Sequence, residues 1–263
     1  MKSYMKWLLQ ILVVIILIFL SQLVNTIGTN LWISLLCVGI VYSIYTLNFD
    51  ERSFSRNKKN DKIMIPIVVW ILIEFIADGV YAYANHGPFF ILSFREIMER
   101  AIKAGVTEEL LYTYVFISLM ISIAKSRKKS PTKKQLIIIV IFTAIVFGAI
   151  HIKNWSYLVS IYQGESSITI AIRIVVHVVN AFSFGLIMKA VFIKTGSLLY
   201  CMLVHTVINI SRIGTALTNN SFLILMVIAL GFMAYGVYLI FHIDESDVEY
   251  WWRKESTRGG RAQ

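Results

Sequence analysis

Long runs of apolar residues constrain this chain more than any other feature of its sequence. A membrane-spanning helix needs about 20 mostly apolar residues, and eight runs approach that length. They cover residues 7–24, 31–48, 64–84, 106–124, 136–152, 167–188, 197–213 and 221–242. Charged residues make up 15% of the chain, against about 25% of a soluble domain. The sequence therefore predicts an all-α, polytopic integral membrane protein with about eight transmembrane helices, and it excludes a disordered chain.

The chain reads as one membrane domain. The first run follows two lysines and resembles a signal peptide, but it is long and no small-residue cleavage site follows it, so we expect a retained anchor. We see no internal repeat and no linker. We therefore expect a single transmembrane domain over residues 1–243 and a cytoplasmic tail over residues 244–263.

Lysine and arginine are distributed unevenly between the runs. With the N-terminus inside, 19 of the 25 fall in inner segments, including a short turn at 189–195, and 4 fall outside. The positive-inside rule then places both termini in the cytoplasm of a multi-pass cell-membrane protein. Tyr250, Trp251 and Trp252 would form an aromatic anchor at the interface. In so apolar a chain the net charge of +10 indicates contact with the lipid bilayer, and no nucleic-acid partner is expected.

Several polar residues interrupt the apolar runs, where an ionisable group is costly and usually functional. Glu108 and Glu109 begin the fourth run, and His151 ends the fifth. His205 and Asn209 lie in the second half of the seventh run. Because the fourth run crosses in the opposite direction to the fifth and seventh, all five residues fall toward the same membrane face. This convergence predicts a site.

The spacing of these residues adds detail. His205 and Asn209 are four residues apart and so project from one helical face. Phe147 stands one turn before His151 in the same way. Glu108 and Glu109 diverge by about 100° in a regular α-helix, so we expect only one of them to point squarely into a cavity.

Such a set of groups suits the hydrolysis of an acyl bond, most naturally a peptide bond. A carboxylate in an apolar cavity can act as the general base on a water, and histidine and asparagine can donate hydrogen bonds to an oxyanion. Other intramembrane hydrolases need parts that this sequence lacks. It has no His-Glu-x-x-His helix, no Gly-x-Ser-x-Gly turn, and a single aspartate, Asp78, within a run.

Three motifs in these runs resemble the CAAX protease and bacteriocin-processing (Abi) family, whose members look like eight-span intramembrane proteases related to the Ras-converting CAAX endopeptidase. The motif Glu-Glu-x-x-x-Arg matches residues 108–113 except at Thr113. The motifs Phe-x-x-x-His and His-x-x-x-Asn match residues 147–151 and 205–209. Each motif alone is weak, but three in order on separate runs are specific. The resemblance covers about residues 100–213.

The resemblance implies a role for each residue. Glu108 would activate the water with His151 as its partner, His205 and Asn209 would form the oxyanion hole, and Glu109 would be a supporting carboxylate. The family has been described both as metallopeptidases and as metal-free glutamate proteases. Two histidines and a glutamate could hold a metal ion in principle. We expect the metal-free mechanism and no cofactor.

Thr113 departs from the motif, because it puts a hydroxyl where the family has a cation. Arg173, at a comparable depth, is a candidate replacement. Counting from the loops also matches Arg173 with Asp78 and Glu74 with His177, as structural pairs between the third and sixth runs. We expect this structural pairing. His177 and Asn180 match no motif and are left out of the site.

Three functions are compatible with the sequence. The first is an intramembrane endopeptidase acting on a peptide or membrane-protein substrate, such as a bacteriocin, a pheromone or a precursor of one. The second is a non-catalytic membrane immunity or regulatory partner with the same fold, which Thr113 favours. The third is a small transporter that uses Glu74 and Asp78 as a proton relay. Charge counting places the site nearer the outer face, so no prenylated substrate is predicted.

Overall fold

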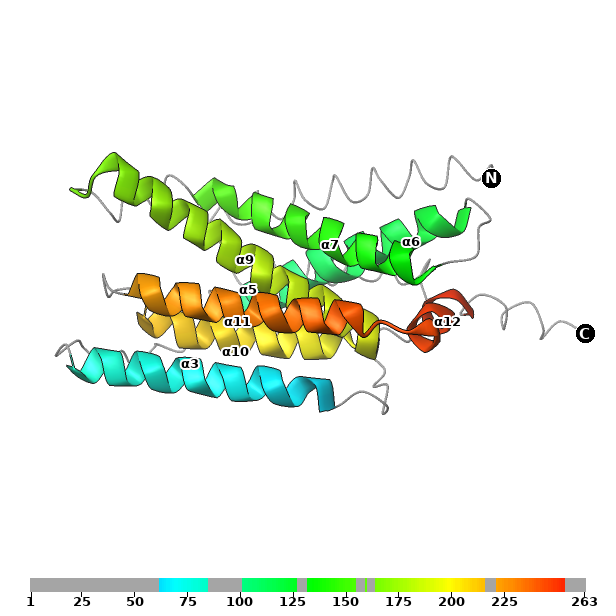
Figure 1. Cartoon of the computed structure of the whole chain (residues 1–263), viewed down its shortest axis with the longest axis horizontal. Helices are drawn as coiled ribbons and strands as arrows, with labels where there is room; N and C mark the ends of the chain where they lie inside the picture. Colours follow the sequence, from blue (N-terminus) through cyan, green and yellow to red (C-terminus); the bar gives the residue numbers. More distant parts are fainter. Residues whose placement is uncertain are drawn as a thin grey trace, which may run out of the picture.

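The structure, a computed structural model, describes residues 62–84, 101–126, 132–154, 159, 164–215 and 221–253. Every element in these ranges is helical (Figure 1). In chain order they are α3 (Met64–Ala84), α5 (Lys103–Glu108), the π-helix η4 (Glu109–Val115), α6 (Phe116–Ser126), α7 (Lys133–Ile150), the 3₁₀ turn η5 (His151–Asn154), α9 (Ser167–Thr195), α10 (Leu198–Thr215), α11 (Ser221–Phe241) and α12 (Glu245–Arg253).

The all-α prediction is confirmed for the described part of the chain, and six of the eight predicted runs coincide with helices there. The runs 7–24 and 31–48 lie outside the described residues. By length and composition, three of the helical stretches could cross a membrane: Ala104–Ile121, Lys133–Ile150 and Ser167–Thr195. A fourth is added if Met226–Phe241 and Glu245–Trp251, which bend by 84° at their junction, count as one span. The described residues therefore hold three or four candidate spans, and the count of eight transmembrane helices stays a prediction.

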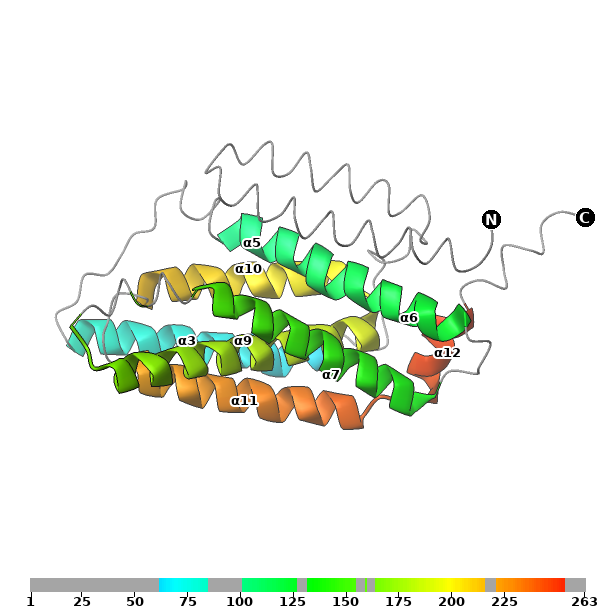
Figure 2. The same ribbon diagram turned by 90° about the horizontal axis from the view of Figure 1, so that it is seen from above.

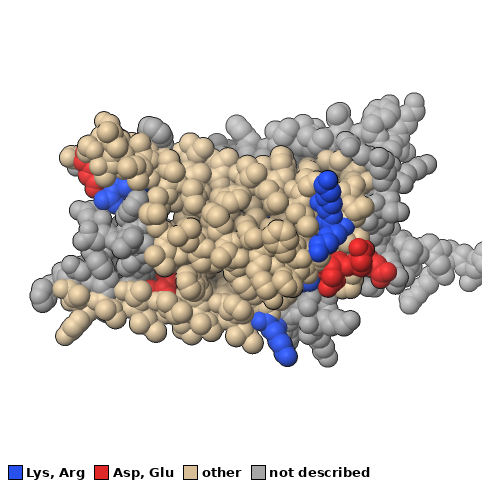
Figure 3. Space-filling view, viewed as in Figure 1, with Lys and Arg blue, Asp and Glu red and all other residues tan. Residues whose placement is uncertain are grey.

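The outer surface of the bundle suits a lipid environment. Phe75 on α3, Ile145 on α7 and Leu230 on α11 are each more than half exposed. Figure 3 shows a broad uncharged belt across one face, with most of the acidic and basic side chains near its two ends. Soluble proteins seldom expose apolar patches of this extent. These apolar helices indicate a multi-pass membrane protein.

Helix α9 is the centre of the bundle. It packs along α7 on one side and α11 on the other (Figure 1). Its first half is largely exposed, whereas Ser183 to Thr195 are buried without a break. Figure 2 shows α5 and α6 continuing as one rod beside α10, with α11 on the opposite side of the bundle. Four helical segments, α5–η4, α7, α9 and α10, therefore meet in the interior.

Local sequence signals fix the ends of these helices. Thr132 and Gln135 form a reciprocal capping box that starts α7. Ser166 caps α9 by accepting a hydrogen bond from the Thr169 N–H. Gly196 ends α9 with a φ of 64°, a left-handed conformation that a residue without Cβ adopts at little cost. α9 and α10 consequently turn tightly against one another.

The end of α9 corrects one sequence prediction. The turn expected at 189–195 is helical, and both Lys189 and Lys194 are buried within α9. Lys194 Nζ lies 2.7 Å from Asp247 Oδ2 and 2.8 Å from the His242 carbonyl oxygen. These two lysines therefore do not belong in the inner loops of the charge count, although the asymmetry keeps the same direction without them.

Helix α12 packs against the end of α9 instead of extending away from it. The Trp251 indole N–H donates to the Ile193 carbonyl at 2.8 Å, and its ring lies 5.1 Å from that of Phe192. Trp251 is buried, so its predicted role as an interfacial anchor is wrong. The division of the chain at residue 243 and the cytoplasmic placement of the tail stay predictions.

Candidate active site

The two acidic residues of the first motif lie where the helix changes its winding. Glu108 ends α5, and Glu109 begins the π-helix η4, all of whose residues are buried. π-helical turns are rare and occur often at functional sites. The π-helix directs Thr113 back toward Glu109, and the Thr113 hydroxyl donates to Glu109 Oε2 at 2.5 Å.

Helix α5 approaches α10 very closely at this point. A Cβ atom added to Gly105 would stand 2.8 Å from the backbone nitrogen of Thr206. Gly105 lies one turn before Glu108, and Thr206 follows His205. The absence of a side chain at Gly105 therefore allows the first and third motifs to meet.

His205 contacts both acidic residues. Its Nδ1 lies 2.8 Å from Glu109 Oε1, and its Nε2 lies 3.9 Å from Glu108 Oε2. Both carboxylates therefore lie near one imidazole, and the expectation that only one of them points squarely into a cavity stays a prediction. The two nitrogens of one imidazole point in different directions, so one ring can serve two diverging side chains.

Glu108 also faces the histidine of the second motif. His151 Nε2 lies 3.8 Å from Glu108 Oε2. Both histidine distances exceed hydrogen-bonding range, and Glu108 forms no hydrogen bond within the described part of the chain. Its side chain is 26% exposed, whereas that of Glu109 is completely buried. Glu108 is thus the carboxylate that water can reach.

The other ring nitrogen of each histidine fixes its orientation. His151 Nδ1 lies 2.8 Å from the Phe147 carbonyl oxygen, which can only accept, so Nδ1 carries the proton. In His205 the partner of Nδ1 is the Glu109 carboxylate. When ionised, this group can only accept a hydrogen bond, so Nδ1 of His205 also carries the proton. Both imidazoles therefore present Nε2 to Glu108, as a lone pair when neutral and as a donor when protonated.

Aromatic rings enclose these polar atoms. The Phe184 ring lies 4.7 Å from the ring of His205, and the Phe147 ring lies 4.7 Å from that of His151. Phe147 and Phe184 are both buried. The apolar walls lower the local dielectric constant and strengthen the interactions between the charged groups inside.

Asn209 shares the helix of His205 but is not held by the other predicted residues. It lies one turn further along α10 and is partly buried. It forms no hydrogen bond to the carboxylates or histidines among the described residues. Its amide is therefore available to a bound molecule.

Lys189 is the residue that the sequence analysis missed. It is fully buried in α9, and its Nζ lies 4.1 Å from the centre of the Phe147 ring. The positive charge of Lys189 and the negative charge of Glu109 attract one another. The signal that could have found it is a lysine within a long apolar stretch, which was assigned to a turn.

The other predicted polar pairs have different outcomes. Arg173 forms a two-point ion pair with Glu165, with both nitrogen–oxygen distances at 2.8 Å. Arg173 therefore does not replace the motif arginine beside Glu109. The side chain of Asp78 lies outside the described residues, so its pairing with Arg173 stays a prediction. The pairing of Glu74 with His177 also stays a prediction. The ring of His177 lies 5.9 Å from the ring of His151.

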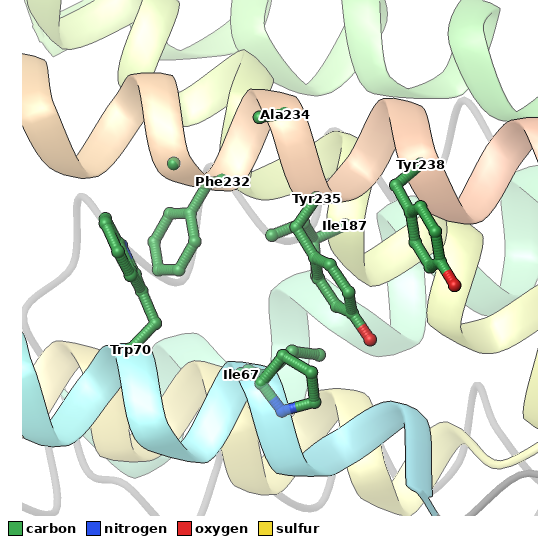
Figure 4. Close-up of a pocket in the computed structure, with 9 residues that line it drawn as sticks. Ile67, Trp70, Ile187, Phe232, Ala234, Tyr235 and Tyr238 are labelled. Carbon is green, nitrogen blue, oxygen red and sulfur yellow. The ribbon is translucent and has the colours of Figure 1, made fainter.

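Neither a metal-binding group nor the cavity described below coincides with the predicted catalytic residues in the described part of the chain. The described His, Cys, Asp and Glu side chains form no group of three placed to hold a metal ion. A cavity of about 340 Å³ lies between α3 and α11 (Figure 4). The side chains of Trp70, Phe232 and Tyr235 surround it, and none of the predicted catalytic residues lines it.

Comparison with protein families tests the resemblance to the CAAX protease family. Residues 90–211 match the family model described as type II CAAX prenyl endopeptidase Rce1-like. Over these residues, which make up a little under half of the chain, the sequence is similar to the Rce1-like CAAX endopeptidase family. The match includes all three motifs and confirms the predicted CAAX protease relationship. Searches of curated proteins and of solved structures found no match.

The match supports a coarse functional statement: its similarity to this family suggests an intramembrane protease that acts on peptide substrates. The arrangement of Glu108, His151 and His205 lies inside the matched region. The family model alone names neither the substrate of this chain nor the group that activates water.

Proposed function

We propose that the protein is an intramembrane endopeptidase in which Glu108 activates the attacking water. The observation that carries this proposal is the approach of two histidine Nε2 atoms to one carboxylate oxygen, at 3.8 and 3.9 Å. A carboxylate with no hydrogen bond of its own in the described chain, yet partly open to water, is suited to accept a proton. Long catalytic distances are common before a substrate binds.

The proposed reaction begins when a substrate carbonyl enters beside His205. Water attacks the carbonyl carbon and transfers a proton to Glu108, and His151 Nε2 orients that water. The carbonyl oxygen becomes an oxyanion, which accepts hydrogen bonds from His205 and Asn209. When the tetrahedral intermediate collapses, Glu108 returns the proton to the leaving amine. A new carboxyl and a new amino terminus result.

The neighbour of His205 determines how it can act. Because Nδ1 donates to Glu109, His205 can also donate from Nε2 only when the ring carries both protons. The Glu109 carboxylate, 2.8 Å away, stabilises that charged ring. The proposal therefore requires a proton on both ring nitrogens of His205 when the oxyanion forms, and a carboxylate at Glu108 when the water attacks.

The substrate that we propose is a peptide or a membrane-protein segment that reaches the site partly through lipid. Processing of a bacteriocin-like peptide is one reaction of this kind. The proposed chemistry uses the side chains alone, so prior treatment with EDTA should leave the rate unchanged. Loss of activity with EDTA and its return with zinc would contradict this part.

The test compares membranes that contain the wild-type protein, Glu108→Gln or Glu245→Gln at equal protein level. Glu245 is an exposed carboxylate on α12 and serves as the matched control. New N-termini should appear with the wild type and the control, and fall about 100-fold or more with Glu108→Gln. In H₂¹⁸O, the matching new C-termini should carry ¹⁸O. Identical N-termini in all three would contradict hydrolysis and favour a non-catalytic partner protein.

A further inference from the structure

Lys189 is a buried cation that the proposed reaction does not use. Its exposed fraction is zero, and its Nζ has no hydrogen-bond partner in the described chain. The contact with the Phe147 ring, at 4.1 Å, stabilises the charge only in part. A buried ammonium that lacks hydrogen bonds needs a nearby negative charge.

Glu109 supplies that negative charge. Among the charged groups, Glu109 attracts Lys189 most strongly, and Glu108 does so more weakly. Lys189 is in turn the strongest electrostatic attraction that acts on Glu109. The two residues come from different helices, and both are completely buried. The two charges attract one another without an ion-pair contact within 4.0 Å in the described residues.

The other described groups around Glu109 do not carry a positive charge in every state of the site. Thr113 donates a hydrogen bond to Oε2 but carries no charge. His205 is charged only when protonated. Lys194, the next lysine of α9, is paired with Asp247 at 2.7 Å.

We propose that Lys189 is a positioning residue whose buried ammonium group balances the charge of the buried Glu109 carboxylate, so that Glu109 holds His205 with Nε2 toward Glu108. In this chain Lys189 takes the charge-balancing part that an arginine at position 113 has in the family motif. The inference rests on the proposed function, because it assigns His205 a role in the reaction. It also links the motifs, since the same ammonium lies on the ring of Phe147, which packs on His151.

The first experiment compares Lys189→Met with Lys194→Met, a matched buried lysine on the same helix. At equal amounts of folded protein, Lys189→Met should lower the cleavage rate by about 100-fold and Lys194→Met should not. Lys189→Arg should retain more activity than Lys189→Met. A normal rate for Lys189→Met in folded protein would overturn the inference.

Moving the charge tests the comparison with the motif arginine. The double variant Lys189→Ala/Thr113→Arg removes the lysine ammonium near Glu109 and adds an arginine guanidinium at position 113. The double variant should cleave at least about tenfold faster than Lys189→Ala. If it is as slow as Lys189→Ala although folded, a cation beside Glu109 is not what the site requires.

A stability cycle keeps the inference testable if single variants fold poorly. Lys189→Met leaves the Glu109 charge buried alone, so the folded yield in detergent should fall. Lys189→Met/Glu109→Gln removes both charges and should recover yield and melting temperature. No recovery would overturn the pairing. This cycle does not require catalysis, whereas activity that survives Glu108→Gln would reject the proposed function alone.

Discussion

At the scale of single residues, His205 determines how the site can work. Its two nitrogens connect a completely buried carboxylate with a partly exposed one. The buried partner, Glu109, also accepts a hydrogen bond from Thr113. The three side chains form one network, in which the hydroxyl at position 113 orients the carboxylate that orients the imidazole. A neutral residue at this motif position is therefore compatible with an ordered site.

Thr113→Val should disturb both the stability and the activity of the protein. Valine has the shape of threonine but cannot donate to the Glu109 carboxylate, and a hydrogen bond to a charged group contributes about 2 kcal/mol. Thr143→Val is the control, because the Thr143 hydroxyl is also buried but donates to the Ile139 carbonyl oxygen. We expect a larger loss of melting temperature in detergent for Thr113→Val, with a several-fold lower cleavage rate. Equal effects of the two variants would contradict a special role for Thr113.

Sequence reasoning identified the acidic and histidine residues but not their surroundings. Glu108, His151 and His205 could be grouped because each interrupts an apolar run at a similar depth. Lys189 was not grouped with them, because it follows the sixth apolar run directly and was assigned to a turn. A lysine near the end of an apolar run normally marks the end of a span. Only tertiary contacts show that this one is inside.

At the scale of helices, the approach of α5 to α10 brings the first motif to the third. The contact depends on Gly105, because a Cβ atom there would meet the backbone of Thr206. Backbone atoms cannot rotate away as a side chain can. The two helices would have to separate, which would move Glu108 away from His205.

Gly105→Ala should therefore destabilise the protein although alanine favours helices. The gain in helix propensity is about 1 kcal/mol, whereas overpacking a tight contact costs about 1–3 kcal/mol. Gly236→Ala on α11 is the matched control, because its nearest neighbours are side-chain atoms of Leu186 at 3.1 Å. Thermal unfolding in detergent and cleavage by the folded fraction would measure the effect. A Gly105→Ala protein as active and stable as the control would refute the importance of this crossing.

The helices themselves were largely predictable, but their winding was not. Hydrophobic length located α3, α7, α10 and α11 to within a few residues. The 3.6-residue period predicted that the Glu108 and Glu109 side chains diverge, but it could not show that they approach the two different nitrogens of His205. The spacing of apolar residues does not reveal the π-helix that begins at Glu109. The end of α9 was placed seven residues early, because two buried lysines were read as loop residues.

A buried ion pair between Lys194 and Asp247 contributes to the packing of helix α12 on the end of α9, beside the contacts of Trp251. Asp247→Asn would leave the Lys194 ammonium buried with a weaker partner. Removing one member of a buried pair costs about 3 kcal/mol or more, so α12 should detach from α9 on mild heating. Limited proteolysis should then cut near residue 245 sooner than in Glu245→Gln, which changes an exposed carboxylate of the same helix. Equal protection of the two variants would show that α12 does not depend on this pair.

At the scale of the whole molecule, helix α9 relates the described bundle to the membrane. Arg173, with its partner Glu165, and Lys194, with its partner Asp247, mark charged positions toward the two ends of this helix. Their separation of 21 residues along α9 corresponds to about 32 Å of helix, close to the hydrocarbon thickness of about 30 Å. The uncharged belt in Figure 3 lies between charges at the two ends of that face. Lys189 is therefore a charge within the apolar layer, which is tolerated because it is buried in protein.

This arrangement predicts that the two ends of α9 face opposite sides of the membrane. Single cysteines in place of Ser167 and Glu245, in a chain whose native cysteines are replaced, would report on the two ends. Both positions are exposed. Since most lysines and arginines lie on the predicted inner side, an impermeant maleimide added to intact cells should label the cysteine at position 167. It should label the cysteine at position 245 only after the cells are opened. Labelling of both from outside would contradict the transmembrane course of α9, and the reverse pattern would invert the protein and place the C-terminal end of α9 outside.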